Sequence, residues 1–445
     1  MEADSYPYFW ILVVLGVGGV LAFVKPYAGF LGALLVLTAG HVARFNQTRL
    51  PGLGPLLNLS DACVIVALVS FFFDVIADRR RIRMPRIIPA MVLVLFIAGV
   101  QSSWKFGWTH ETLRSLRWGL QLPIFLFLGA NMVTTTDRLQ KLIGTLFAGA
   151  LLAAAQHVLF VANIWQTKSL TMKTYHLMRT IGYWGGCMAS AFLLTAVLWR
   201  MPARRLLRVL SLTAGCLFLA TLFLNQTRSL WLGTIGTVPC LPMVFKDRFP
   251  IWRIAKFTLV GVVLLVVGTF CLQRAMPGLS PFEMATGRVT ELVSNDAKYN
   301  LHRGTREAAF ALEMNAWWDG TLIFGRGLWY IQGAEGRTRA TLKDIAYAHL
   351  GYVTYLSQLG IVGLIVYGLF LPLSVLRDAR WLWTLGESDV LDYAALLGGA
   401  SIICLSLMFA ASGHFLSVAY EAPGVLYGAL SAAVSARRCG TRIRI

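Results

Sequence analysis

Residues 350–373 read LGYVTYLSQLGIVGLIVYGLFLPL, without a single charged side chain. A helix needs about 20 mostly apolar residues to cross the hydrocarbon core of a bilayer, so this stretch alone predicts a membrane-spanning helix. Similar runs fill most of the chain. Of its 445 residues, 57% are hydrophobic and 14% are charged, against about 25% charged in an average soluble domain. The sequence therefore predicts an all-α polytopic membrane protein.

Apolar runs separated by short polar links set the number and the bounds of the expected spans. We count about 13, and about 12 is equally compatible because the ends of apolar runs are soft. The expected spans are residues 7–24, 27–43, 61–78, 87–104, 113–133, 138–162, 182–199, 207–226, 229–245, 257–272, 349–375, 391–411 and 415–436. The first run lacks the basic leader of a cleavable signal peptide, so we expect it to be a span. The spans divide the chain into a transmembrane bundle (1–272), one long polar loop (273–348) and C-terminal transmembrane helices (349–445).

Basic residues give the expected orientation. The chain carries 40 Lys and Arg against 21 Asp and Glu, a net charge of +19. In so apolar a chain, the preference of basic residues for cytoplasmic loops explains this excess, and we expect no nucleic-acid partner. If the spans alternate, four basic clusters lie on one side, the cytoplasm, and the N-terminus lies outside, or inside if an early span is miscounted. The clusters are Arg79–Arg81 with Arg83 and Arg86; Arg200, Arg204, Arg205 and Arg208; Lys246, Arg248, Arg253 and Lys256; and Arg437, Arg438, Arg442 and Arg444.

The 273–348 loop is expected on the opposite, outer side. It holds nine Lys and Arg and eight Asp and Glu, so its charge is nearly balanced. It contains a helical-looking stretch, Arg303 to Trp318, followed by Gly320, Gly325 and Gly327. Because a loop of this length in a compact protein is usually functional, we expect any active site here.

Arg228 stands between two apolar runs with almost no polar linker, in Asn225-Gln226-Thr227-Arg228-Ser229-Leu230-Trp231. A guanidinium at a membrane boundary must find an anion or reach the headgroups. One interpretation is a headgroup anchor beside Trp231 in an aromatic belt. The other is a phosphate clamp, because the guanidinium presents a fork that matches phosphate oxygens.

His349 opens the span at 349–375, directly after the outer loop. An imidazole titrates near neutral pH and can take a proton from an attacking hydroxyl, which makes His349 a candidate general base. The alternative is an interfacial histidine at the start of a helix. The other histidines we considered, His41, His157 and His414, carry only a structural interpretation.

Three further arginines are expected on the outer side. Arg303 and Arg306 are three residues apart on one helical face with Glu307 alongside, so a solvated, salt-bridged helix is an alternative to anion binding. Arg179 precedes the span at 182–199.

Metal-binding patterns are not expected on the outer side. The acidic group Glu387, Asp389 and Asp392 falls in the cytoplasm if the spans alternate. The seven cysteines lie mostly inside apolar runs without C-x-x-C spacing, which is typical of small buried hydrophobes. Walker, Rossmann and H-E-x-x-H patterns are absent. We therefore predict neither a metal nor another cofactor.

Four elements in the second half of the chain together resemble the O-antigen ligase and polymerase superfamily of bacterial envelope enzymes. The arginine between two spans fits the family's Thr-x-Ser-Arg-like segment, here 226–229, and the outer loop carries Arg306 and Phe310 ahead of a Gly-x-Gly, here 325–327. The family's His-Asn-x-x-Leu-x-x-Leu-x-x-x-Gly-hydrophobic-x-Gly matches the segment from His349 to Gly363. Leu350 stands where the family has Asn, which leaves any role of that Asn unfilled.

The resemblance implies a membrane glycosyltransferase fold of the C class and a particular reaction in the periplasm, at the bacterial inner membrane. The donor would be a glycan on undecaprenyl diphosphate, and the acceptor a sugar hydroxyl of the lipid A–core oligosaccharide. Arg228 and Arg306, supported by Arg303 and Arg179, would stabilise the leaving diphosphate. His349 would be the general base of an inverting, metal-independent displacement.

Related reactions remain as alternatives. A polymerase of the superfamily would use a second lipid-linked glycan as acceptor, and often carries an Arg-(ten residues)-Gly pattern in two outer loops. Here Arg179 leads to Ser190, Arg303 to Met314 and Arg306 to Trp317, so the pattern is missing and a ligase is favoured. A protein O-oligosaccharyltransferase would differ only in its acceptor. A transporter is a different class, but the chain shows neither an internal repeat nor many intramembrane charges.

Overall fold

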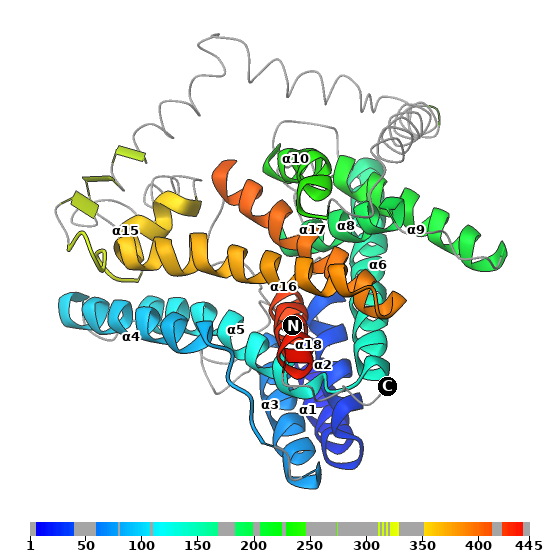
Figure 1. Cartoon of the computed structure of the whole chain (residues 1–445), viewed down its shortest axis with the longest axis horizontal. Coiled ribbons are helices and arrows are strands. Elements are labelled where there is room, and N and C mark those ends of the chain that lie inside the picture. Colours follow the sequence, from blue (N-terminus) through cyan, green and yellow to red (C-terminus); the bar gives the residue numbers. More distant parts are fainter. Residues whose placement is uncertain are drawn as a thin grey trace.

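The computed structural model describes most of the expected helices. The described residues are 6–39, 59–78, 81–106, 110–167, 183–198, 205–224, 228–245, 321–328, 351–411 and 421–438, with the isolated positions Arg274, Phe310, Ala311, Met314, Asn315, Trp317 and Trp318. Within these residues the fold is helical, apart from an isolated β-bridge between Thr321 and Gly325. The predicted all-α class is confirmed, and Figure 1 shows the arrangement.

The helices follow the apolar runs of the sequence. They are α1 (Tyr6–Val24), α2 (Pro26–Ala39), α3 (Leu59–Asp78), α4 (Ile87–Phe106), α5 (His110–Met132), α6 (Thr136–Thr167), α8 (Tyr183–Leu198), α9 (Arg205–Leu224), α10 (Arg228–Val244), α15 (Gly351–Gly363), the π-helix η4 (Leu364–Phe370), α16 (Leu371–Leu385), α17 (Asp389–Ala411) and α18 (Glu421–Arg438). The expected span at 257–272 lies outside the described residues.

Five described segments are long and apolar enough to cross a membrane. They are Ser60–Asp78, Ile87–Trp104, Thr136–Val161, Gly351–Leu385 and Asp389–Ala410. Shorter apolar helices accompany them, among them Pro26–Ala39 and Ser229–Val244. The chain is therefore a multi-pass membrane protein, as the sequence predicted.

Helices far apart in the sequence lie side by side in the fold. In Figure 1, α4 and α5 form one layer on the left, and the continuous run of α15, η4 and α16 lies against α4. Helix α17 runs back alongside α16 and packs against α8 and α10. The apolar residues 351–373 therefore lie between α4 and α17.

Glycines allow α5 and α18 to approach at backbone distance. A Cβ added to Gly129 of α5 would lie 2.1 Å from the carbonyl oxygen of Val425, and one added to Gly428 of α18 would lie 2.0 Å from that of Leu126. Gly428 follows Gly424 at a spacing of four, the pattern that brings two membrane helices close together. Van der Waals packing at close range holds these helices together, because lipid tails are as apolar as the helices and give no hydrophobic driving force.

Polar side chains join helix ends that alternating spans would assign to the basic side. Asn131, at the end of α5, is hydrogen-bonded to the backbone of Arg83 just before α4. Arg437, at the end of α18, is paired with Glu387, which follows α16. The opposite ends of α4 and α15 meet the described part of the long loop, as set out below.

Arg138, in the first turn of α6, is held by a largely buried ion pair. Its guanidinium donates to both carboxylate oxygens of Asp74 on α3, at 2.8 and 3.0 Å, and to the carbonyl of Met132 at 3.0 Å. The same group lies 4.8 Å from the ring centre of Tyr27 on α2. The side chain of Asp74 is only 6% exposed. Arg138 therefore ties together three helices around one buried charge.

We expect Arg138→Gln to destabilise the protein by about 3–5 kcal/mol, because it leaves the Asp74 carboxylate buried without its cation. The matched control is Lys141→Gln on the same helix. Lys141 pairs with Asp137 at 2.7 Å, but both side chains are more than half exposed, so we expect a loss of roughly 0.3–0.5 kcal/mol. Unfolding of the purified variants in detergent measures both values. Equal losses in the two variants would contradict the buried-pair argument.

Candidate functional site

Of the residues proposed from sequence for the chemistry, Arg228 alone lies within the described residues. Arg228 is the first residue of α10, so its backbone is placed at a helix N-terminus, although nothing is described of its side chain. His349, Arg306, Arg303 and Arg179 lie outside the described residues. The described residues inside the same loop and after His349 bring together the Gly-x-Gly segment and the helix that follows His349.

That helix is broken at Gly360. Its φ of 70° and ψ of −168° interrupt α15 within the apolar run that the sequence predicted as one continuous span. In an unbroken helix the N–H of Ile361 would donate to Ser357 and that of Val362 to Gln358, four residues earlier. The break leaves two N–H groups and two carbonyls to be satisfied in another way. In a membrane each unsatisfied group would cost several kcal/mol.

Residues 321–328, which we call the glycine loop, satisfy all four groups. Two loop N–H groups donate to the carbonyls upstream of the break, and two loop carbonyls accept from the N–H groups downstream of it. The bonds join Arg326 N to Ser357 O (2.9 Å), Gly327 N to Gln358 O (3.1 Å), Ile361 N to Leu322 O (3.1 Å) and Val362 N to Ile323 O (3.1 Å). The loop is thus inserted into the helix, and each of two lost helical bonds is replaced by two bonds to the loop.

Both segments need glycine where they meet. Gly325 has a φ of +70°, and a Cβ there would lie 2.5 Å from the backbone nitrogen of Gly360. A Cβ on Gly360 would lie 2.2 Å from the carbonyl oxygen of Ile323. These are contacts to backbone atoms, which cannot turn away as a flexible side chain could. The Gly-x-Gly of the loop and the first glycine of the Gly-hydrophobic-x-Gly segment are therefore two halves of one contact.

Helix α4 provides the third side of this junction. The hydroxyl of Ser102 donates to the carbonyl of Leu328 at 2.7 Å. A Cβ added to Gly327, whose φ is +101°, would lie 2.6 Å from that hydroxyl oxygen. The amide of Gln101 donates to the hydroxyl of Thr321 at 3.3 Å. Leu328 is fully buried. The glycine loop is therefore fixed to the end of α4 as well as to α15.

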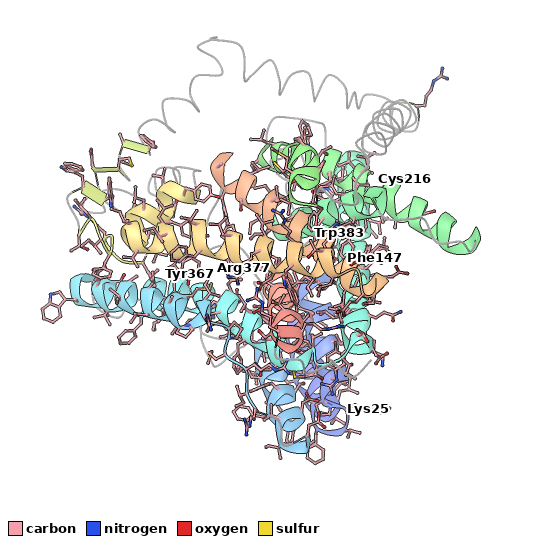
Figure 2. All side chains as sticks on the ribbon, in the orientation of Figure 1. Lys25, Phe147, Cys216, Tyr367, Arg377 and Trp383 are labelled. Atoms are coloured by element: carbon pink, nitrogen blue, oxygen red, sulfur yellow. The ribbon has the colours of Figure 1, made fainter. Side chains whose placement is uncertain are left out.

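Two tyrosine hydroxyls hold the segment after His349 in place. Tyr352 donates to the carbonyl of Ser406 on α17 at 3.1 Å, and Tyr367 of η4 donates to that of Met91 on α4 at 3.2 Å. Figure 2 labels Tyr367 where the η4 layer meets α4. The rings of Tyr355 and Tyr367 are stacked with centroids 5.7 Å apart. The helix entered just after His349 is therefore anchored on both sides.

Trp231 links the start of α10 to the end of α9. Its indole N–H donates to the carbonyl of Leu222 on α9 at 2.6 Å, and its side chain is partly buried. Helix α10 is itself seated closely on α17, because a Cβ on Gly233 would lie 2.8 Å from the carbonyl of Cys404. Trp231 therefore joins the two helices rather than serving only as an interfacial aromatic, and the backbone of Arg228 is held one turn away.

The acidic residues noted in the sequence lie elsewhere. Glu387 and Ser388 line a pocket of about 250 Å³ together with Thr136, Asp137 and Arg437, at the ends of α6, α16 and α18. Among the described residues, no three His, Cys, Asp or Glu side chains gather closely enough to hold a metal ion.

A protein-family model described as O-antigen ligase matches residues 213–368. This match supports membership of the O-antigen ligase and polymerase superfamily. The match begins in α9 and ends in η4, so it contains Arg228, the glycine loop and the break at Gly360. Arg303, Arg306 and His349 also fall inside it, whereas Arg179 does not. No protein in the curated comparison matches the chain significantly.

The match supports a role in glycosyl transfer by a multi-pass membrane protein. The junction of the glycine loop with α15 gives a physical reason for two of the segments that carried the resemblance. Physical reasoning on the sequence alone had no reason to place them in contact. The available signal was glycine itself, which is unfavourable inside a helix by about 1 kcal/mol and often marks a close backbone approach.

Proposed function

We propose that the protein transfers an O-antigen glycan from undecaprenyl diphosphate to a sugar hydroxyl of lipid A–core oligosaccharide, on the periplasmic face of the inner membrane. The observation that supports the proposal is the junction inside the family match, where the glycine loop is inserted into the helix that follows His349. It holds residues 321–328, which follow Arg303 and Arg306 in the sequence, at the break in the helix that follows His349.

The difficult step in this reaction is the departure of the diphosphate. The acceptor oxygen forms a bond to the anomeric carbon while the bond from that carbon to the diphosphate oxygen breaks, so negative charge grows on the leaving group. Cations fixed beside it before the reaction stabilise the transition state, each contact typically by ~3 kcal/mol. We assign this role to Arg228 and Arg306, with Arg303 and Arg179 in support. The position of Arg228 at the N-terminus of α10 adds the favourable end of the helix dipole.

The acceptor hydroxyl must lose its proton as it attacks, and His349 is our general base. The proton passes to the imidazole, and undecaprenyl diphosphate leaves as the anion. A single displacement from the face opposite the leaving group inverts the configuration at the anomeric carbon. Arginines supply the positive charge in this scheme, so we expect the reaction to need neither a metal nor a nucleotide.

A polymerase reaction is the nearest alternative, because the family match covers both activities. The missing Arg-(ten residues)-Gly pattern after Arg179, Arg303 and Arg306 favours the ligase. Transfer to a protein hydroxyl would use the same donor chemistry.

The test is to incubate the purified protein with undecaprenyl-diphosphate glycan and lipid A–core, with EDTA and without nucleotide. We expect a ladder of glycan on the core lipid and release of undecaprenyl diphosphate. Glycan that lengthens on the carrier while the core lipid stays unmodified would identify a polymerase instead. Transfer only to an added protein acceptor would point to an oligosaccharyltransferase. No release of diphosphate with any acceptor would reject glycosyl transfer by this chain.

A further inference from the structure

The described part of the link between α3 and α4, residues 81–86, is held in place by Asn131. Residues 81–85 form no helix, and the side-chain amide of Asn131 pairs with the backbone of Arg83 as a neighbouring strand would. The Arg83 N–H donates to the Asn131 oxygen at 2.8 Å, and the Asn131 nitrogen donates to the Arg83 carbonyl at 2.8 Å. Asn131 is itself buried, so the link is fixed from the protein side and presents its side chains outward.

Three arginines project from this link, and the neighbouring carboxylates are already in use. Arg81, Arg83 and Arg86 are exposed, and none of them has an acidic partner among the described residues. Asp74 and Asp78, which precede the link, lie within 4.0 Å of Arg138 instead. A rigid, uncompensated positive edge of this kind favours an anionic partner.

Apolar side chains alternate with the arginines. Ile82 and Met84 are 57% and 58% exposed, and both flanking helices also expose apolar side chains. The apolar faces of these helices are formed by Phe72 and Ile76 at the end of α3 and by Leu93 and Phe96 on α4, each more than half exposed. In a membrane protein such faces contact acyl chains. The partner therefore needs an anionic head next to an apolar body.

We propose that residues 81–86, together with the apolar faces of α3 and α4, bind an anionic phospholipid. Its phosphate lies among Arg81, Arg83 and Arg86, and its acyl chains lie along Phe72, Ile76 and Leu93. The general excess of positive charge on cytoplasmic loops requires no ordered backbone, whereas here a buried asparagine fixes one. Because α4 also carries Ser102, which holds the glycine loop, bound lipid stabilises the helix that supports the candidate site.

The test is a thermal unfolding titration of the full-length protein in neutral detergent with phosphatidylglycerol or phosphatidylcholine. We expect a saturable rise in melting temperature with phosphatidylglycerol alone. Arg81→Gln/Arg83→Gln should raise the half-saturating lipid concentration about 30-fold, from the usual contribution of each basic residue near an anionic surface. The control, Lys141→Gln/Arg380→Gln, removes the same charge from two other exposed positions and should leave the titration unchanged.

A second variant tests the contacts to the acyl chains separately from the contacts to the phosphate. Ile82→Ser/Met84→Ser keeps every arginine and should weaken binding of phosphatidylglycerol while the preference over phosphatidylcholine persists. Equal responses to the two lipids, or an unchanged titration in Arg81→Gln/Arg83→Gln, would overturn the proposal. So would a full shift produced by soluble glycerol phosphate, since that would indicate a phosphate site rather than a lipid site. If the arginine variant is unstable without lipid, native mass spectrometry can compare the phosphatidylglycerol retained by wild type and variant. Equal retention would overturn the proposal.

Discussion

Glycosyl transfer is expected to fall by about 100-fold or more when Gly360 is replaced by alanine. The new Cβ would lie 2.2 Å from the carbonyl oxygen of Ile323, and the φ of 70° costs an L-residue roughly 1–2 kcal/mol. The glycine loop has to leave the break, which separates it from the helix that follows His349. A misplacement of about 1 Å at a distance from the chemistry can cost about 100-fold. The measurement is ligation turnover of variant and wild type at equal protein concentration.

The matched control is Gly144→Ala on α6, where a Cβ meets no atom within 4 Å. Its turnover should stay within about twofold, since alanine suits a helix at least as well as glycine. Gly325→Ala should reproduce the loss from the loop side, because its Cβ would lie 2.5 Å from the nitrogen of Gly360. Both variants need to be monodisperse after purification. Full turnover in Gly360→Ala would show that the loop need not occupy the break during catalysis.

Removing the proposed general base should have the other large effect. We expect His349→Ala to lower turnover by about 100- to 10,000-fold, the usual range for a positioned acid or base. Arg228→Ala should cost about 100- to 1,000-fold through the lost stabilisation of the diphosphate. Arg228→Lys keeps the charge but not the fork, so it should recover only part of that loss. Turnover is read from the ladder on lipid A–core.

Suitable controls come from the same outer loop, where His302→Ala and Arg337→Ala remove residues of the same types. They should retain most of the activity. The pH profile distinguishes the role of His349, because a general base gives an acidic limb that the alanine variant lacks. An unchanged profile in a His349→Ala variant with residual activity would assign the histidine to acceptor positioning instead.

Hydropathy predicted where the helices are because an apolar run of bilayer length has few alternatives to a helix. It failed at Gly360, since the run 350–373 carries no charge and the break depends on a loop that is distant in the sequence. The expected span ended at 375, whereas α16 runs on past Arg377 and Arg380. The helix continues to Leu385 since Ala379 and Leu382 on its other face are buried.

The candidate site was predicted mainly by resemblance, and physical chemistry alone was less informative. A single arginine or histidine at a membrane surface has an ordinary structural interpretation, so composition could not rank Arg228 or His349. The glycines of the sequence carried further information about close backbone contacts. Gly325 and Gly360 are required by close backbone contacts and Gly327 by its φ of +101°, and the Gly424–Gly428 spacing predicts the approach of α18 to α5.

The pairing of α5 with α18 also constrains how the chain is made. At about 5–20 residues per second, tens of seconds separate the emergence of Gly129 from that of Val425, its neighbour in the folded protein. Until then the small-residue face of α5 has lipid or the insertion machinery beside it. Completion of this part of the fold therefore belongs to the end of translation. The early helices therefore have to remain stable in the bilayer before their partner α18 is synthesised.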